Sequence, residues 1–234
     1  MRRLRHRKWT DDVLSANKDI GKDLSTFGEA DLSQYSTLEI GCGEGGFLLR
    51  ISKAHPEERY LGIEIDKNAF AMAVKHGSEV KKEQANFLLL NAPVERIMSV
   101  FKDKQFQNIY INFPDPWPKK KQQKRRLSYP TNLKDYVRIL KDDGTIYFRT
   151  DNDNLFLDSI GYFNSTEAYD IQVLNPFFSE KYDFLPTTEY ETKFRAKGMP
   201  IHLIIARKMS PLFEGRHFSF LSLGLLLLLL ASTL

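Results

Sequence analysis

The sequence predicts an α/β fold in which a mostly parallel, seven-stranded sheet carries helices on both faces and closes with an antiparallel strand. Short apolar segments alternate with segments of helical periodicity along most of the chain, and this alternation is typical of a doubly wound parallel sheet. The last two apolar segments are separated by a long segment with no evident helical pattern, so we expect them to pair as an antiparallel hairpin.

The predicted elements follow one another from residue 37 onward. Residues 1–36 are polar with weak periodicity, and we expect a basic arm with a short helix there. Strands are predicted at 37–40, 60–65, 87–90, 108–111, 144–150, 169–174 and 201–207. Helices are predicted at 47–51, 67–83, 94–100, 131–140 and 154–163. Residues 37–208 therefore form one α/β domain, and residues 209–234 form a hydrophobic tail.

The composition agrees with an ordinary globular chain. At 234 residues, with 42% hydrophobic and 27% charged residues, the chain can bury a core without cross-links. The single cysteine, Cys42, excludes an intramolecular disulfide. Much of the positive charge lies in two short runs, one at the N-terminus and one after Pro118. Such clusters fit phosphate contacts, although a single run is as often a solvated tail or loop.

The two ends of the chain do not resemble targeting segments. No apolar segment follows the basic residues at the start, so we expect no secretory signal. Residues 218–234 carry no charge and include six consecutive leucines, and as a helix they would span only about 25 Å of a ~30 Å hydrocarbon core. A weak membrane anchor is therefore less favoured than a helix on an apolar surface or a non-native extension, and the role of the tail stays open.

Polar residues follow successive predicted strands, where an open parallel sheet binds its ligands. The glycine-rich turn at 41–46 follows the first strand and lets the backbone approach a ligand at a helix N-terminus. Glu64 lies 23 positions after the first of these glycines, where a carboxylate can accept from ribose hydroxyls. Asn91, whose amide can pair with an adenine edge, follows the third strand, and Asp115 and Asp151 follow the fourth and fifth.

This series indicates a cofactor that contains adenosine. A nicotinamide dinucleotide would use the same turn and the same acid. Glu39 and Asp115 favour a cofactor with a free amino-acid end, because an ammonium group requires acceptors whereas a pyrophosphate requires donors. The alternative for Glu39 is a structural role at a strand end.

A stiff, basic loop follows the fourth predicted strand, and residues 112–127 read NFPDPWPKKKQQKRRL. Prolines on both sides restrict the backbone around Asp115. Trp117 either stacks on an unpaired RNA base or belongs to the core. We expect six cations to contact phosphates: Lys119, Lys120, Lys121, Lys124, Arg125 and Arg126.

The segments LEIGCGEGGF, GIEID, NFPDPWPKKKQQKRRL, RTDN and TEYETKF occur in this order, followed by Gly198 and Pro200. Together they resemble the bacterial tRNA (guanine-N7-)-methyltransferase family over residues 1–207. The resemblance implies a cytoplasmic enzyme with a Rossmann-like, S-adenosylmethionine-dependent methyltransferase domain at 37–208. It also implies methyl transfer to N7 of a guanine in the tRNA variable loop, at tRNA position 46.

The resemblance further implies the residues of the site. It places S-adenosylmethionine against Glu39, Gly41, Gly43, Glu64, Asn91 and Asp115, and it makes Asp115 the catalytic residue. It assigns tRNA to Lys119, Asp151, Thr192, Lys193, Phe194 and Arg195. The family usually has aspartate in place of Asn91, and the tail has no counterpart in it. We expect no metal, because the histidines lack ligand spacing, and no obligatory protein partner.

The chemistry of N7 defines the role expected of Asp115. Guanine N7 carries a lone pair and no proton, so its methylation requires placement and no general base. We expect the Asp115 carboxylate to position the guanine and to compensate the positive charge that develops on it. The alternatives are a methyltransferase for another base or a small molecule, and a non-catalytic RNA-binding protein on the same fold.

Overall fold

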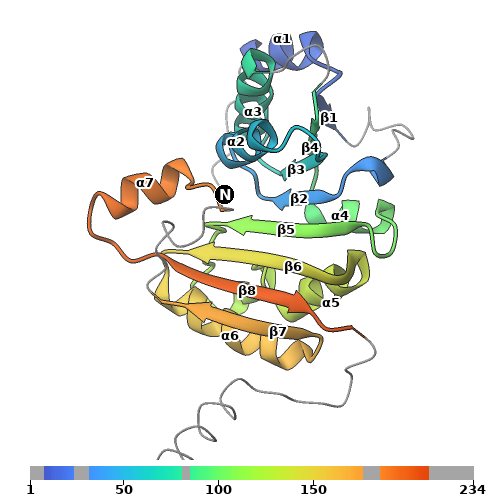
Figure 1. The fold of residues 1–234 in the computed structure, drawn as a ribbon. Coiled ribbons are helices and arrows are strands. Elements are labelled where there is room, and N and C mark those ends of the chain that lie inside the picture. The colour runs from blue at the N-terminus through green and yellow to red at the C-terminus, as the bar shows by residue number, and fades with distance from the viewer. Residues whose placement is uncertain (1–7, 24–31, 81–84, 176–184, 211–234) are drawn as a thin grey trace, which may run out of the picture.

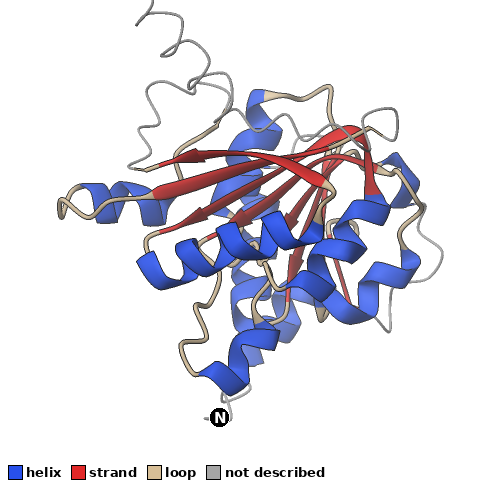
Figure 2. Ribbon diagram, turned by 90° about the horizontal axis from the view of Figure 1, so that it is seen from below, coloured by secondary structure: helices blue, strands red, loops and turns tan. Residues whose placement is uncertain are grey.

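The computed structural model describes residues 8–23, 32–80, 85–175 and 185–210. One sheet runs through the molecule, with helices on both of its faces (Figures 1 and 2). Its strands are β1 Gly21–Asp23, β2 Thr37–Ile40, β3 Tyr60–Glu64, β4 Phe87–Asn91, β5 Phe106–Asn112, β6 Leu140–Thr150, β7 Tyr169–Leu174 and β8 His202–Lys208. The α-helices are α1 Lys8–Ala16, α2 Gly46–Ala54, α3 Lys67–Val80, α4 Val94–Ile97, α5 Pro130–Ile139, α6 Asp153–Thr166 and α7 Glu189–Arg195. Short 3-10 helices are η1 Leu32–Gln34, η2 Met98–Val100 and η3 Lys120–Arg125.

The strand order is β1-β4-β3-β2-β5-β6-β8-β7. Strands β1 to β6 are parallel, whereas β8 runs antiparallel to both β6 and β7. The predicted mostly parallel sheet with an antiparallel closing strand is therefore confirmed. The strand order reverses between β2 and β5, so a ligand crevice is expected beyond the carboxyl ends of these two strands.

Two hydrophobic clusters cover the two faces of the sheet. Along β4, Leu88 and Leu90 belong to the cluster that includes side chains of α4, α5 and α6, whereas Phe87 and Leu89 belong to the cluster that includes side chains of α2 and α3. This alternation follows from the two-residue period of a strand. Because both faces are covered, the central strands are apolar along nearly their whole length.

The prediction of seven strands was wrong by one. Strand β1 lies inside the segment predicted as a basic arm and pairs in parallel with β4 at the edge of the sheet. Its three residues are too few and too polar to show a strand pattern. Ile20, just before it, is buried, and its carbonyl accepts from the Leu89 N–H at 2.8 Å. Part of the arm is thus built into the α/β domain.

The segment before β8, expected to be irregular, contains helix α7. The Thr188 hydroxyl caps it by accepting from the Glu191 N–H at 2.9 Å. Thr-x-x-Glu is a sequence signature of a helix start, and this signal could have identified the helix. Residues 1–7, with most of the N-terminal basic run, and 211–234, with nearly all of the predicted tail, lie outside the described residues. Within the described ranges, no helix is both long and apolar enough to cross a bilayer.

Candidate active site

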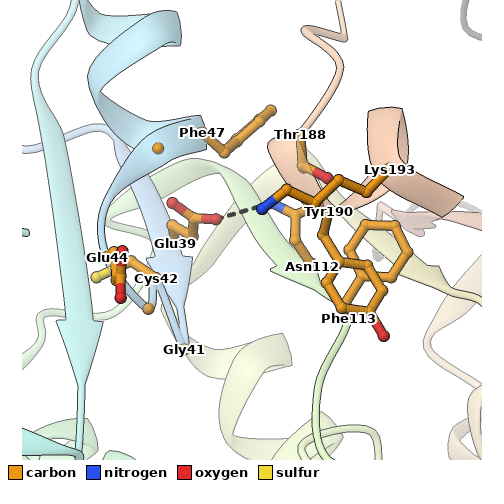
Figure 3. A pocket seen from close by; sticks show the side chains of 12 residues that line it. Glu39, Gly41, Cys42, Glu44, Phe47, Asn112, Phe113, Thr188, Tyr190 and Lys193 are labelled. Carbon is orange, nitrogen blue, oxygen red and sulfur yellow. Dashed lines mark hydrogen bonds between the residues drawn. The ribbon is translucent and has the colours of Figure 1, made fainter. Parts of the chain in front are cut away.

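A pocket of about 320 Å³ lies beyond the carboxyl ends of β2 and β5, where the strand order reverses. The glycine-rich turn forms one wall and helix α7 the other (Figure 3). The lining residues are Glu39, Gly41, Cys42, Gly43, Glu44, Gly46, Phe47, Asn112, Phe113, Thr188, Tyr190 and Lys193. Its volume lies at the lower end of the range of small-molecule sites, about 300–1,000 Å³.

The glycine-rich turn presents bare backbone to this pocket. Gly41 and Gly43 have φ of 75° and 55°, values that favour glycine. A Cβ placed on Gly43 would meet no atom within 4 Å, so it would stand in open space. The Gly43 N–H donates to Glu64 Oε2 at 2.9 Å, and the Asp66 N–H donates to Glu64 Oε1 at 2.7 Å. Glu64 therefore fixes the turn and keeps a second lone pair on each oxygen for a ligand.

Asn91 lies beside Glu64 at the carboxyl ends of β4 and β3. Its Nδ2 donates to the Glu64 carbonyl at 2.8 Å and to the Ile65 carbonyl at 3.2 Å. The amide oxygen takes no part in these two bonds, and an oxygen suits the amino group of an adenine. Both residues lie outside the lining of the pocket, next to the turn that forms its wall.

Glu39 is the buried acid of the pocket, with 2% of its surface exposed. Its Oε1 accepts from Asn112 Nδ2 at 2.8 Å (Figure 3), and its Oε2 has no hydrogen-bond partner among the described residues. Burial raises the pKa of this carboxyl to about 8, although the Asn112 hydrogen bond, the charge of Arg149 and the backbone N–H of Leu48 act to lower it. A buried acceptor without a partner fits a cationic group of a ligand.

Arg149 continues this set of bonds away from the pocket. It is fully buried, and its Nε donates to Asn112 Oδ1 at 2.8 Å. Its Nη1 donates to Glu191 Oε2 and to the Pro186 carbonyl, both at 3.0 Å. The guanidinium also lies 4.8 Å from the centre of the Phe47 ring. Glu39 is thereby connected through Asn112 and Arg149 to helix α7.

Aromatic side chains form the wall on the side of α7. Phe113 lies 4.6 Å from Tyr190, and Tyr190 stacks on Phe194 at 4.1 Å between ring centres. Phe113 has φ of 51°, a left-handed conformation that is uncommon for an aromatic residue and typical of functional sites. Burial raises the pKa of the Tyr190 phenol, and its hydrogen bond to the Asp151 carboxylate raises it further. The phenol therefore stays protonated and donates to Asp151.

The predicted substrate segment, residues 192–195, divides between different environments. Lys193 lines the pocket, and Phe194 belongs to the aromatic wall. The Thr192 hydroxyl donates to the Thr188 carbonyl at 3.1 Å, along its own helix. Arg195 donates from Nε to Glu191 Oε1 at 2.8 Å. Lys193 is thus the member of the segment that reaches the pocket.

Asp115 is exposed and lies two residues beyond Phe113, outside the lining of the pocket. Trp117, with φ of 39°, follows it and is half-buried, and the Arg125 guanidinium lies 5.0 Å from the centre of its ring. The same loop carries an exposed Lys119. The structure therefore brings Asp115 close to the pocket along the chain but does not place it in the wall.

Arg126 does not belong to the phosphate-binding run, and its prediction was wrong. Its side chain is 2% exposed; Nε donates to the Pro116 carbonyl at 2.8 Å, and Nη1 donates to Asp158 Oδ2 at 2.6 Å. Because these bonds fasten the proline-rich loop to α6, Arg126 acts inside the protein. The other five cations of the run, from Lys119 to Arg125, are exposed as expected.

Sequence reasoning missed several residues of the site. Phe113, Thr188 and Tyr190 line the pocket but lie in segments whose conformation was not anticipated. Arg149 and Glu191 form a buried ion pair, and no local sequence pattern indicates that these two residues pair. Within the described residues, no three histidine, cysteine or acidic side chains gather as a metal site.

Comparisons with known proteins agree with this geometry. A family model described as "Putative methyltransferase" matches residues 33–204. The tRNA (guanine-N(7)-)-methyltransferase of Limosilactobacillus reuteri is 37% identical over 214 residues, covering 87% of this chain and 98% of the relative. The enzymes of the same name from Bacillus subtilis and Macrococcus caseolyticus are 36% and 38% identical, covering 86% and 88% of this chain and 96% and 99% of the relatives.

Solved structures of other methyltransferases share the fold at low sequence identity. The 16S rRNA methyltransferase KamB superposes with a TM-score of 0.54 at 13% identity, covering 79% of this chain and 95% of that one. The tRNA (m1A58) methyltransferase TrmI of Aquifex aeolicus gives 0.51 at 14% identity, covering 90% and 72%. The solved structures show the shared fold, and the sequence identity to the curated relatives shows the family: the chain belongs to the tRNA (guanine-N(7)-)-methyltransferase family.

Proposed function

We propose that the protein transfers a methyl group from S-adenosylmethionine to N7 of a guanine in tRNA, and that the target is position 46 in the variable loop. The observation that carries the proposal is the buried Glu39 Oε2, an acceptor without a partner, beside an open glycine turn. It occurs in a chain 36–38% identical to enzymes named for this reaction. We also propose that the protein acts in the cytoplasm.

The residues present fit the cofactor. Glu39 Oε2 would accept from the ammonium group of its amino-acid end, which supplies the missing partner. Gly41 and Gly43 leave room for the ligand against the backbone. The free lone pairs of Glu64 would accept from the ribose hydroxyls, and the Asn91 amide oxygen from the adenine amino group.

The wall on the side of α7 fits a purine and its phosphates. The rings of Phe113 and Tyr190 offer an apolar face to a base that has left its stack. Asp151 accepts a hydrogen bond from the Tyr190 hydroxyl, and so contributes to the site by orienting Tyr190. Lys193 at the pocket and Lys119 on the loop would attract phosphates. Thr192 and Arg195 contribute by holding α7.

The chemistry requires placement and charge compensation. Bound S-adenosylmethionine supplies an electrophilic methyl group on a sulfonium. The protein holds the guanine so that the N7 lone pair is in line with that methyl, a role in which proximity lowers a barrier by about 7–11 kcal/mol in favourable cases. Asp115, on its proline-restricted loop, stabilises the positive charge that develops on the purine. It need not remove a proton, because N7 carries none.

The test is methyl transfer by the purified protein to tRNA. We expect labelled S-adenosylmethionine to modify bulk tRNA, and nucleoside analysis to recover 7-methylguanosine. A tRNA transcript with adenosine at position 46 should accept no methyl group, whereas the unchanged transcript should. Another methylated nucleoside would overturn the assignment, and equal methylation of both transcripts would overturn the position.

A further inference from the structure

We propose that Arg149 is a positioning residue that sets helix α7, the substrate side of the pocket, in register with Glu39 on the cofactor side. The inference rests on the proposed function and extends it to a residue outside the pocket. Arg149 touches neither the pocket nor a reacting atom, since its side chain has no exposed surface. It would act through the residues that it holds.

A continuous series of polar contacts joins the two walls. Asn112 at the end of β5 donates through Nδ2 to Glu39 and accepts through Oδ1 from Arg149. Arg149 in β6 then pairs with Glu191 of α7, and Glu191 pairs with Arg195 one turn later. The amide of Asn112 can satisfy both neighbours in one orientation only, because the carboxylate accepts and the guanidinium donates. The series therefore defines one arrangement of β2, β5, β6 and α7.

Helix α7 depends on contacts of this kind with the rest of the protein. It has seven residues, far fewer than an isolated helix requires in water. Figure 1 shows it beyond the carboxyl ends of β5 and β6, beside the sheet rather than packed along one of its faces. The Arg149–Glu191 ion pair is fully buried on both sides, at 3.0 Å. A buried pair in a low dielectric fixes geometry strongly.

A contribution to stability alone does not explain the Arg149–Glu191 ion pair. Arg149 Nη2 is buried without a hydrogen-bond partner among the described residues, which costs free energy. Buried ion pairs are often replaced by apolar residues without loss of stability. What apolar residues could not supply is the directional link from Glu39 through Asn112 to α7. The two residues of α7 in the pocket, Tyr190 and Lys193, would then lose their fixed distance from the cofactor.

The experiment separates position from stability with two single variants, their combination, the conservative Arg149→Lys and a matched control. The single variants are Arg149→Met and Glu191→Leu, and the combined variant carries both changes. The control is Arg138→Met, because Arg138 on α5 also pairs with an acid, Asp103, and donates to carbonyl groups away from the pocket. Each protein is measured for thermal unfolding, S-adenosylmethionine binding, tRNA methylation and amide hydrogen exchange in α7.

We expect the combined variant to unfold close to the wild type, since no buried charge is left without its partner in the pair. It should bind S-adenosylmethionine within about threefold of the wild type, because Arg149 reaches Glu39 only through Asn112, whose amide nitrogen can still donate to Glu39. Its kcat/KM for tRNA should nevertheless fall by about 30-fold or more through misplacement of α7, and amides of α7 should exchange faster. Arg149→Lys, which keeps the charge opposite Glu191, should recover part of the loss.

The inference would be overturned if the combined variant were as stable as the wild type and also as active on tRNA. Unchanged exchange in α7, or a loss no larger than that in Arg138→Met, would also overturn it. Failure of the proposed function is a separate result, seen when the wild type forms no 7-methylguanosine. In that case the exchange of α7 in Arg149→Met against Arg138→Met still tests the positioning role.

Discussion

The two walls of the pocket are built in different ways. The wall formed by the glycine-rich turn, the proposed cofactor wall, comes from short continuous segments, in which a strand runs directly into a turn and the turn into a helix, as β2 does into α2. The wall on the side of α7, the proposed substrate wall, is held by residues that are far apart in the chain: Arg149 and Glu191 are 42 positions apart. The proline-rich loop next to it is fastened in a similar way by Arg126 and Asp158, which are 32 positions apart. Under the proposed function, changes to the first wall should therefore act on cofactor binding, and changes to the second should act on placement of the tRNA.

Asp115→Asn is expected to have the largest effect, because under the proposed function it removes the carboxylate that compensates the charge developing on the guanine. Turnover should fall by about 10²–10³-fold, while S-adenosylmethionine binding changes little because Asp115, although the family resemblance places it against the cofactor, lies outside the lining of the pocket. If Asp115 compensates charge, the residual activity should not rise steeply at high pH. A wild-type pH profile that is bell-shaped and collapses in Asp115→Asn would instead identify Asp115 as a base.

Glu39→Gln tests the cofactor wall by its pH dependence. The raised pKa of Glu39, about 8, means that below this pH the empty protein holds a proton that binding of an ammonium group must release. Wild-type binding should therefore tighten by up to about tenfold per unit as pH rises from about 6 to 7.5, the range in which the α-amino group stays charged.

In Glu39→Gln this pH dependence should disappear, and binding at pH 7.5 should weaken by about 30-fold, the cost of losing one partner of a buried charge pair. Calorimetric titration at several pH values measures both effects. Glu95→Gln, an exposed acid on α4, serves as the control and should keep the wild-type slope. A slope that persists in Glu39→Gln would assign the proton to another group.

Arg126→Met tests the fastening of the proline-rich loop next to the pocket. It leaves the Pro116 carbonyl and Asp158 without their donor, so the free energy of unfolding should fall by about 1–3 kcal/mol. The unfolding midpoint should drop by roughly 2–4 °C per kcal/mol, and turnover by about tenfold because Asp115 is held less firmly. Arg125→Met, at the exposed neighbouring cation, should change stability by no more than about 0.5 kcal/mol. Equal effects in the two variants would contradict the anchoring role.

Tyr190→Phe is expected to have the smallest effect. It removes the hydroxyl that donates to Asp151 but keeps the ring against Phe113 and Phe194. The loss in kcat/KM for tRNA should be about three- to tenfold, the value of one hydrogen bond. Tyr190→Ala, which also removes the ring, should lose more. Equal losses in both variants would place the whole contribution in the hydroxyl.

The difference between the walls also decides what the sequence could predict. All seven predicted strands are present because their apolar segments lie in a sheet covered on both faces. The positions of Glu39, Gly41 and Gly43 followed from the strand and turn that carry them. The role of Arg126 could not follow in this way, since five exposed cations lie beside it in the same run. Only the packing of α6 shows that it points inward.

The same limit applies to α7 and β1. The Thr188-x-x-Glu191 capping signature could have predicted the start of helix α7. The position of α7 against the pocket, however, depends on the Arg149–Glu191 pair. Strand β1 gains its structure from hydrogen bonds to β4 rather than from its own three residues. Features that depend on distant partners are those that a local pattern does not show.

The position of β8 has a consequence for synthesis of the chain. β8 is the last strand of the described sheet in sequence, yet it lies inside the sheet, bonded to β6 on one side and β7 on the other. A nascent chain that ends before residue 202 would therefore leave the edge of β6 open and β7 without a neighbour. Completion of this half of the sheet must wait until residues 202–208 have left the ribosome, and an open strand edge during that interval invites association with other chains.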